Sequence, residues 1–467
     1  MKTTITLLFF ISIYLNAQTN ITGEIDGILS AELYNKGFSV FIYDPLAEDT
    51  LYAKSIFEPL IPASNIKLYT TATAIDLLSP EIDLVTKIFI DDDGDQDSLI
   101  AGNIYIKGFG DALLTEADLD SAIQLIKLNG VKRIKGDIVG DESYFDKIYT
   151  RDDWIQNERA NVTLPPISGL SLDRNRIVIK FDRNLKVGEP PAYSLLPHGT
   201  FYEVSNSAKI TNFRSTPKIF TRTSQNKINI SISGGIQQRR SSYSYLIYPD
   251  SPAVFTAMVF RQKLQEQEIQ VDGMARSGKT NPGAIFLTEI THPFSDMLNR
   301  VNKKSDNYLA ENLFKILGAE FSMKEGNSFY ATQSVMTFLY DNDIFSEGTS
   351  IVDGSGISRF NKTTTASIVN LLEHIYFDLS NFDFYYNSLA IAGIDGTLEE
   401  RLYESNAYQN FRGKTGSLYG VSSISGYLTT NSNRDLIISI IMNDTSKGQH
   451  YMREIQDKII AWCSENL

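Results

Sequence analysis

The chain has 467 residues, with 43 Lys and Arg against 56 Asp and Glu and a formal net charge of -13 at pH 7. This acidic balance, without a Lys/Arg-rich block, argues against a nucleic-acid partner. Cys463 is the single cysteine, so no intramolecular disulfide can form, and we expect it to be a packed thiol.

Residues 1–17 are typical of a secretory signal. The stretch MKTTITLLFFISIYLNA combines Lys2, an apolar run from Ile5 to Leu15 and the small residue Ala17. Leu15 stands where a small residue is usual before the cleavage point, which makes the match imperfect. We expect an exported, periplasmic protein without a transmembrane segment, either soluble or loosely associated with the wall or membrane.

The next elements predict the start of a mixed α and β domain. FSVFIYD and TLYAKSIF are typical of strands. A helix is predicted from Ser64 to Leu78, because apolar residues recur every three to four positions after Pro62. Ser79 and Pro80 then end it.

From about Val85 the sequence changes to short strand-like segments such as KIFI, NIYIKG and KINISISG. Helices return at PAVFTAMVFRQKLQEQ, and the chain closes with two strands, SSISGYLTT and LIISIIM, and an amphipathic helix at residues 451–465. This order predicts β-rich material set inside an α/β frame.

Two motif matches fail on their context. GMARSGKT, at residues 273–280, fits the Walker A pattern, but the Asn-Pro-Gly that follows forbids the helix that a phosphate cradle requires. We interpret it as a polar turn between domains. DDDGDQD, at residues 91–97, has its glycine at the wrong position for a calcium loop, so we expect a solvated hairpin turn.

One S-x-x-K tetrad lies on a predicted helix. The histidines lie far apart, which indicates neither a metal site nor a Ser-His-Asp triad, but a lysine with a lowered pKa can also activate a serine. SNIK places Ser64 and Lys67 on one helix face, whereas the tetrads STPK and SQNK lie among proline or turn residues. The Ser64 amide at the helix start could donate to an oxyanion. The alternative is a capping serine with an exposed lysine.

A second motif, S-D-N, follows in KKSDNYLAENL. Ser305 offers a hydroxyl able to relay a proton, and Asn307 offers an amide able to hold a peptide carbonyl. The alternative is an ordinary helix cap beginning at Ser305.

The third motif is K-T-G in the predicted strand GKTGSLYG. A peptide could lie along this strand through main-chain hydrogen bonds, and Gly416 has no side chain to obstruct it. Lys414 could lower the pKa of Lys67 by like-charge repulsion. Thr415 and Ser417 supply hydroxyls for a substrate carboxylate, and the Ser417 amide supplies a second oxyanion donor. The alternative is an ordinary edge strand with a polar face.

The order of these motifs resembles that of the serine penicillin-recognising enzymes. The chain looks most like the low-molecular-mass class C penicillin-binding proteins, the D-alanyl-D-alanine carboxypeptidase/endopeptidase family. Further family-like phrases are GNIYIKGFGDALLT, GDIVGDESYFD, DGSGISR and SLAIAGIDGTLEERL.

The resemblance implies an α/β (α+β) fold, in which a β-lactamase/transpeptidase-like domain with an antiparallel sheet flanked by helices carries inserted β-rich domains. The stretch between Lys67 and Ser305 is too long for a loop, which agrees with an insertion there. We expect the transpeptidase-like domain at residues 18–85 and 278–467, and an insertion of two subdomains at residues 86–277.

The resemblance also implies roles for the motif residues. Ser64 would be acylated by the D-Ala-D-Ala carbonyl while Lys67 takes its proton. Ser305 and Asn307 would help protonate the departing D-alanine and hold the peptide. Arg359, at the end of DGSGISR, would meet the distal part of the stem peptide or else form a surface salt bridge.

Lys414, Thr415 and Ser417 would recognise the terminal carboxylate, and water would release the shortened peptide. Penicillin would be trapped as a slow acyl-enzyme. The expected partners are therefore peptidoglycan stem peptides and β-lactams, with no metal and no cofactor.

Other functions stay open. A β-lactamase would share the motifs, although the E-x-x-x-N pattern of class A enzymes is absent between the second and third. A catalytically weak wall-binding scaffold would keep the fold, but the intact Ser64, Lys67 and Lys414 argue against it. An esterase or amidase for small substrates has no distinguishing motif.

Overall fold

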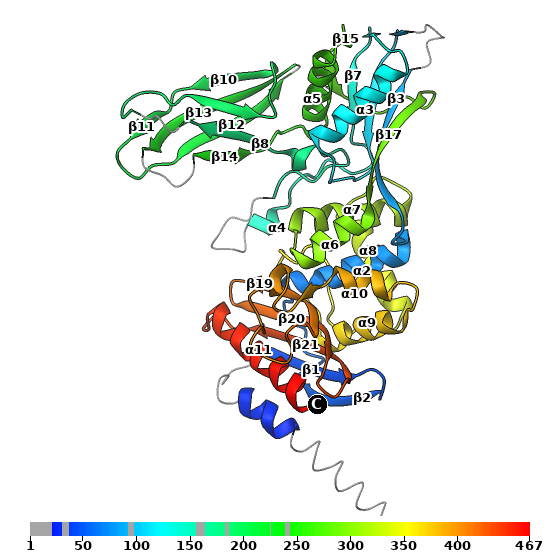
Figure 1. Cartoon of the computed structure of the whole chain (residues 1–467), viewed down its shortest axis with the longest axis vertical. Helices are drawn as coiled ribbons and strands as arrows, with labels where there is room; N and C mark the ends of the chain where they lie inside the picture. The colour runs from blue at the N-terminus through cyan, green and yellow to red at the C-terminus, as the bar shows by residue number, and fades with distance from the viewer. Residues whose placement is uncertain are drawn as a thin grey trace, which may run out of the picture.

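The computed structural model describes residues 21–29, 37–91, 98–155, 164–182, 186–224, 226–238 and 243–467. The molecule is elongated: a sheet with the C-terminal helix lies at one end, helices form the middle layer, and β-rich structure occupies the other end (Figure 1). This is the predicted α+β fold, with an antiparallel sheet flanked by helices. The predicted signal at residues 1–17 lies outside the described residues.

The sheet at the C-terminal end is antiparallel throughout. Its elements are β1 (Phe38–Asp44), β2 (Asp49–Lys54), β18 (Ala390–Ile391), β19 (Phe411–Leu418), β20 (Val421–Thr429) and β21 (Asp435–Asn443), with α11 (Gln449–Asn466) against it. The strand order is β18-β19-β20-β21-β1-β2. Alternate residues face opposite sides, so Ile438 and Ile440 share a core with α11 and the helix at residues 21–29, whereas Ile437 and Ile441 share one with the middle layer.

The middle layer consists of helices packed around one central helix. They are α2 (Ile66–Leu78), which follows the 3-10 helix η1 (Ala63–Asn65), α6 (Phe294–Lys303), α7 (Asn307–Ser322), α8 (Ser328–Asp341), α9 (Thr365–Phe377) and α10 (Phe382–Ser388). In α2 every residue from Ile66 to Ile75 is buried. A helix without a polar face suits such a central place. Its first turn is consequently held on all sides.

The chain passes from the middle layer to the β-rich end through two long paired strands (Figure 1). These are β3 (Asp83–Ile90) and β17 (Ile285–Pro293), which pair antiparallel. They belong to a sheet in the order β16-β7-β5-β3-β17, completed by β5 (Ile104–Gly108), β7 (Ile138–Asp141) and β16 (Ala275–Ser277). The helices α3 (Glu116–Leu128) and α5 (Pro252–Glu266) pack against this sheet.

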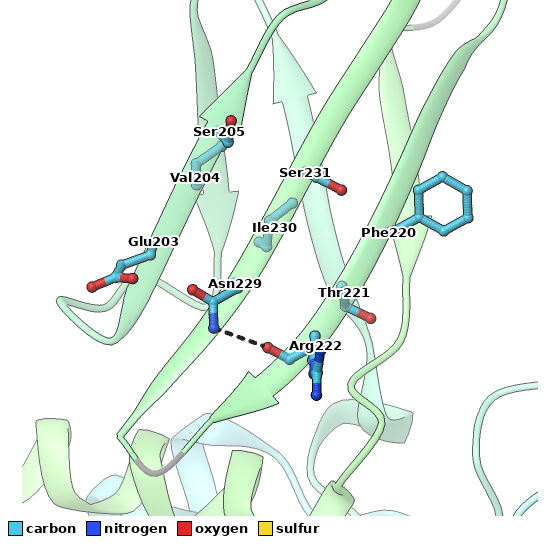
Figure 2. Close-up of a pocket in the computed structure, with 9 residues that line it drawn as sticks. All are labelled: Glu203, Val204, Ser205, Phe220, Thr221, Arg222, Asn229, Ile230 and Ser231. Carbon is cyan, nitrogen blue, oxygen red and sulfur yellow. Dashed lines mark hydrogen bonds between the residues drawn. The ribbon is translucent and has the colours of Figure 1, made fainter.

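Smaller sheets complete the β-rich end. They contain β4 (Leu99–Ile100), β6 (Arg133–Ile134) and β15 (Gln270–Val271); β8 (Ile177–Phe181), β9 (Tyr193–Leu196) and β14 (Ser244–Ile247); and β10 (Tyr202–Asn206), β11 (Lys209–Thr211), β12 (Pro217–Ser224) and β13 (Lys227–Gln237). Figure 2 shows the face formed by β10, β13 and β12, where Asn229 Nδ2 donates to the Arg222 carbonyl at 3.3 Å. Phe220 projects from the β12 edge of this face.

Several predicted elements occur where the sequence placed them. FSVFIYD is β1, the helix predicted to end at Leu78 is α2, and the closing strands and helix are β20, β21 and α11. The sequence analysis missed α3, which lies among strand-like segments, and α9. Cys463 is buried, as predicted, and burial raises the pKa of its thiol to about 12.

The two failed motif matches have different outcomes. In the Walker A match, β16 ends at Ser277 and residues 278–284 are not helical, so the prediction that no helix follows the motif is confirmed. The stretch DDDGDQD lies outside the described residues except for Asp91. The domain limits at residues 85 and 278 stay predictions, and we propose that the second limit lies nearer the end of β17 at Pro293, because β17 pairs with β3.

Candidate active site

Ser64 lies on η1, directly before α2, and backbone contacts hold this segment from two sides. A Cβ at Gly356 would lie 1.9 Å from the Ala63 carbonyl oxygen. From the other side, Ser423 Oγ donates to the Pro62 carbonyl at 2.6 Å. Ala63 itself has φ 48°, in the left-handed region. Such strain persists where the surrounding structure fixes the backbone, and it is common at functional sites.

Lys67 lies one helical turn after Ser64 and is fully buried. Its Nζ lies 3.0 Å from Ser64 Oγ, 2.7 Å from Asn307 Oδ1 and 2.5 Å from the Ser355 carbonyl oxygen. Burial lowers the pKa of Lys67 to about 8, although nearby carboxyls oppose the shift. The alternative of an exposed lysine beside a capping serine is therefore wrong. An amine with this pKa can accept a proton from the serine near neutral pH.

Ser305 and Asn307 lie at the turn between α6 and α7. Asp306 is the N-cap of α7, because its side chain accepts from the Leu309 amide at 3.1 Å, so the alternative that Ser305 caps the helix is wrong. Ser305 has φ 56°, again in the left-handed region. An ion pair with Arg174, from the β-rich end, fixes Asp306. The turn thus presents Asn307 to the buried lysine.

The strand β19 lies against η1 and has an open outer edge. On this edge β18 pairs with β19 as far as Gly413, and no strand of the described part of the chain pairs beyond it. Thr415 and Ser417 reach the surface, whereas Lys414 and Gly416 are buried. Unpaired main-chain groups on such an edge can bind an extended peptide as an additional strand.

Lys414 faces the interior rather than the surface. It is fully buried, and its Nζ donates to the Thr415 carbonyl at 2.8 Å. Burial, followed by the charge of Lys67, holds the pKa of Lys414 well below its usual range. The predicted repulsion between the two lysines is present in the lowered pKa of Lys414, but burial is the main cause of the lowered pKa of Lys67.

Gly416 is required for packing between β19 and η1. A Cβ at this position would lie 2.3 Å from Ser423 Oγ, 2.6 Å from the Pro62 carbonyl oxygen and 2.9 Å from the Ser64 nitrogen. The predicted reason for the glycine, free approach of a substrate, is thus replaced by a different one. The glycine lets the strand come close to the backbone of Ser64.

A cavity of about 610 Å³ lies in front of Ser64. The motif residues that line it are Ser64, Ser305, Asn307, Thr415 and Ser417. The other lining residues come from η3 (Gly396–Leu398), the stretch just after it, and α11: Thr397, Glu400, Arg401, His450, Arg453, Glu454 and Asp457. The structure therefore brings the exposed parts of all three motifs to one cavity.

Two arginines relate differently to this cavity. Arg453 lines it, and its Nη2 donates to Ser417 Oγ at 2.9 Å. Among the described residues Arg453 forms no ion pair, and its neighbour Arg401 pairs with Asp457 at 2.7 Å. Arg359 does not line the cavity, and its Nη2 donates to the Tyr419 carbonyl at 2.5 Å, in the turn after β19.

Sequence reasoning missed several residues that support the site. Glu311 on α7 and Asp353 are buried carboxyls whose charges act on Lys67. Trp154, on the short helix α4 (Asp152–Ile155) in the core of the middle layer, donates through Nε1 to Asp353 Oδ2 at 3.1 Å. Arg151 Nη1 donates to the Val352 carbonyl at 2.6 Å. The sequence phrase DGSGISR, which begins with Asp353, could have drawn attention to this residue. Nothing in the sequence distinguishes Glu311 from any other helical glutamate.

The comparisons with known proteins agree with the geometry. A model of the D-Ala-D-Ala carboxypeptidase 3 (S13) family matches residues 22–466. The chain belongs to this family. D-alanyl-D-alanine carboxypeptidase DacB of Haemophilus influenzae is 24% identical over 83% of this chain and 81% of its own length. The D-alanyl-D-alanine carboxypeptidase of an Actinomadura species is 26% identical over 92% of this chain and 82% of its own.

The fold is similar to that of a solved member of this group. The crystal structure of penicillin binding protein 4 (dacB) from Haemophilus influenzae superposes with a TM-score of 0.78 at 21% identity. The match covers 93% of this chain and 99% of that one. It includes the β-rich end as well as the middle layer and the sheet, so the whole architecture is shared.

Gly416→Ala should impair both folding stability and acylation by a β-lactam. The added Cβ forces β19 away from η1, and we expect a loss of about 1–3 kcal/mol in the free energy of unfolding. The acylation rate constant should fall at least about tenfold, since the strand and the nucleophile separate. Thermal unfolding and labelling with a fluorescent penicillin measure the two effects.

The control is Gly283→Ala, because a Cβ there meets nothing within 4 Å. It should keep the native melting temperature and rate. A Gly416→Ala protein with the native rate would contradict the packing argument.

We propose that the neutral form of Lys67 is the base, so the rate of acylation should rise with pH and level off above about 8, because burial lowers the pKa of Lys67 to about 8. Below that pH the lysine is increasingly protonated, and the second-order rate constant should fall by up to about tenfold per pH unit. Stopped-flow measurement with a chromogenic β-lactam tests this. A rate that is already constant below pH 6 would show that another group is the base.

Proposed function

We propose that this protein is a serine D-alanyl-D-alanine carboxypeptidase that trims peptidoglycan stem peptides through an acyl-enzyme at Ser64. The single observation that supports this most is the buried Lys67 amine, 3.0 Å from Ser64 Oγ and beside the open edge of β19. In this arrangement Lys67 would be the base, Ser64 the nucleophile and the edge of β19 the place for an extended peptide. Membership of the S13 family supports the same reaction.

In the proposed acylation, Ser64 Oγ attacks the carbonyl between the two D-alanines and its proton moves to neutral Lys67. The backbone amides of Ser64 and Ser417 would stabilise the oxyanion. Asn307 would hold both the lysine and the peptide carbonyl. The proton then passes through the Ser305 hydroxyl to the departing amine, and water later releases the shortened peptide.

The proposed carboxylate site is the end of the cavity formed by Thr415 and Ser417. Arg453 supports it, because its guanidinium already donates to Ser417 Oγ. Lys414 would act from the interior by holding the Thr415 carbonyl. We keep Arg359 as a contact for the distal stem peptide, beside the turn after β19 where it donates to the Tyr419 carbonyl. Longer, cross-linked peptides could use the same edge, which gives an endopeptidase activity.

We propose export to the periplasm on the strength of the signal predicted at residues 1–17. No helix of the described residues is long and apolar enough to cross a membrane. In the described part of the chain no group of His, Cys, Asp and Glu side chains is arranged to hold a metal ion. β-Lactams are proposed as covalent ligands of Ser64, since their amide can replace the D-Ala-D-Ala bond.

Brief exposure to benzylpenicillin should add the mass of one penicillin to the native chain and none to Ser64→Ala. Intact mass spectrometry of the purified protein measures this. Hydrolysis of a pentapeptide ending in D-Ala-D-Ala should disappear in the same variant. No adduct on the native chain would refute the acyl-enzyme and favour a scaffold, whereas rapid loss of the adduct with free penicilloate would favour a β-lactamase.

Arg453→Gln should raise KM for a pentapeptide with a free terminal carboxylate by about tenfold or more, because a charge-assisted hydrogen bond to that group is lost. Steady-state kinetics with a peptide ending in a carboxamide provides the matched control. This substrate lacks the anion, so native and variant enzymes should handle it alike. An equal loss with both peptides would mean that Arg453 supports the structure and not the carboxylate.

A further inference from the structure

The loop at residues 353–358 turns successive carbonyl groups toward α2. The Gly354 carbonyl accepts from Thr70 Oγ1 at 3.0 Å, and the Ser355 carbonyl accepts from Lys67 Nζ at 2.5 Å. This loop therefore supplies Lys67 with a main-chain acceptor that none of the three sequence motifs predicted.

One peptide unit connects Lys67 to a buried carboxyl. The oxygen of the unit, on Ser355, accepts from the lysine, while its N–H, on Gly356, donates to Asp353 Oδ1 at 2.8 Å. Hydrogen bonds at the two ends of one amide polarise it and strengthen each other. Asp353 thus acts on the amine through the amide between them.

Asp353 carries the charge of the buried carboxyl pair. N–H donors approach both of its oxygens, from Gly356 at 2.8 Å, Asn361 at 2.7 Å, Ser358 at 2.8 Å and Trp154 at 3.1 Å. Burial raises the pKa of its neighbour Glu311 to about 8, with the nearby Asp353 charge adding to the shift. Burial also raises the pKa of Asp353, but its donors favour the anion. The donors around Asp353 therefore make it the carboxyl of the pair that ionises more readily.

The geometry around Nζ fixes the direction of the lysine lone pair. A neutral amine has two hydrogens and one lone pair. With the hydrogens directed at the carbonyl oxygens of Asn307 and Ser355, the lone pair faces Ser64 Oγ, which has a hydrogen to donate. Proton transfer then breaks the Ser64 O–H bond, forms an N–H bond and leaves an ammonium that keeps every contact.

We propose that Asp353 is a positioning residue for Lys67, which acts through the Ser355–Gly356 peptide unit to orient the amine toward Ser64. This inference rests on the proposed function and deepens it. Asp353 touches neither substrate nor nucleophile. Its anchor, Trp154, lies on α4, in the segment between β7 and β8 that packs in the core of the middle layer, so this segment contributes to the orientation of the base.

Several charged groups face this lysine, and their signs decide the expected effect. Asp306 and Glu311 approach from α7, Asp353 from its loop, Lys414 from β19 and, beyond the carboxyl pair, Arg151 from the segment between β7 and β8. The Asp353 charge favours protonated Lys67. Its removal should therefore make the neutral base available at lower pH.

The test is the pH profile of β-lactam acylation in Asp353→Asn. Its midpoint should move down by about one pH unit, because a buried charge near the lysine is lost. Its plateau should fall at least about fivefold, because the amine is less well oriented. Thr70→Val removes the hydrogen bond from Thr70 Oγ1 to the Gly354 carbonyl, and it should change neither the midpoint nor the plateau. Glu311→Gln should also move the midpoint down, because the charge of Glu311 likewise favours protonated Lys67.

Each outcome either supports or overturns the proposal. An Asp353→Asn protein with native melting temperature, midpoint and plateau would overturn the proposal, as would a shift of the same size in Thr70→Val. If Asp353→Asn does not fold, replacing Gly356 with glycolic acid turns the Ser355–Gly356 peptide unit into an ester. The change removes the N–H and weakens the Ser355 carbonyl as an acceptor while the Asp353 side chain stays in place, and a native profile would then overturn the proposal. A native chain that is not acylated refutes the proposed function instead. The Lys67 pKa, followed by NMR of isotopically labelled lysine in native protein and variant, still tests the effect of Asp353.

Discussion

The buried amine of Lys67 is the constraint on which the arrangement of the site depends. Moving a charged lysine out of water costs several kcal/mol unless it is neutral or well paired. Here burial lowers its pKa, and acceptors from α7 and from the loop behind α2 satisfy its hydrogens. Because these acceptors come from separate segments, the positions of α2, α7 and the loop are fixed together. The hydrogen bonds that offset the cost of burying Lys67 also orient its amine toward Ser64.

Close backbone packing fixes the nucleophile in a similar way. η1 is pressed between the Gly356 loop and the Gly416 strand, where a Cβ on either glycine would meet main-chain atoms. Ala63 and Ser305 hold left-handed conformations on the two sides of the lysine. Positions of this kind are tolerated where the surroundings leave no alternative. The rigid site is therefore built from main-chain contacts as much as from side chains.

The sequence predicted those features whose chemistry depends on local structure. Ser64 and Lys67 could be paired because a helix places them on one face, and the S-D-N turn and the K-T-G strand followed from their flanking elements. Burial and distant partners could not be predicted in the same way. Lys414 was expected to lower the pKa of Lys67 through its charge, but the main cause is the burial of Lys67 itself, which the sequence did not show. Asp353 and Glu311 are ordinary acidic residues until tertiary packing sets them behind the lysine.

The strand pairing has a consequence for the order in which the protein matures. β1, near the start of the chain, pairs with β21, near its end, and β19 reaches η1 after the whole β-rich end and the middle helices have been made. Pairings between distant parts of a chain form late and slowly. A partly synthesised chain therefore contains Ser64 and Lys67 but lacks the strand beside them. The complete site can therefore assemble only after the last strands of the chain have been made.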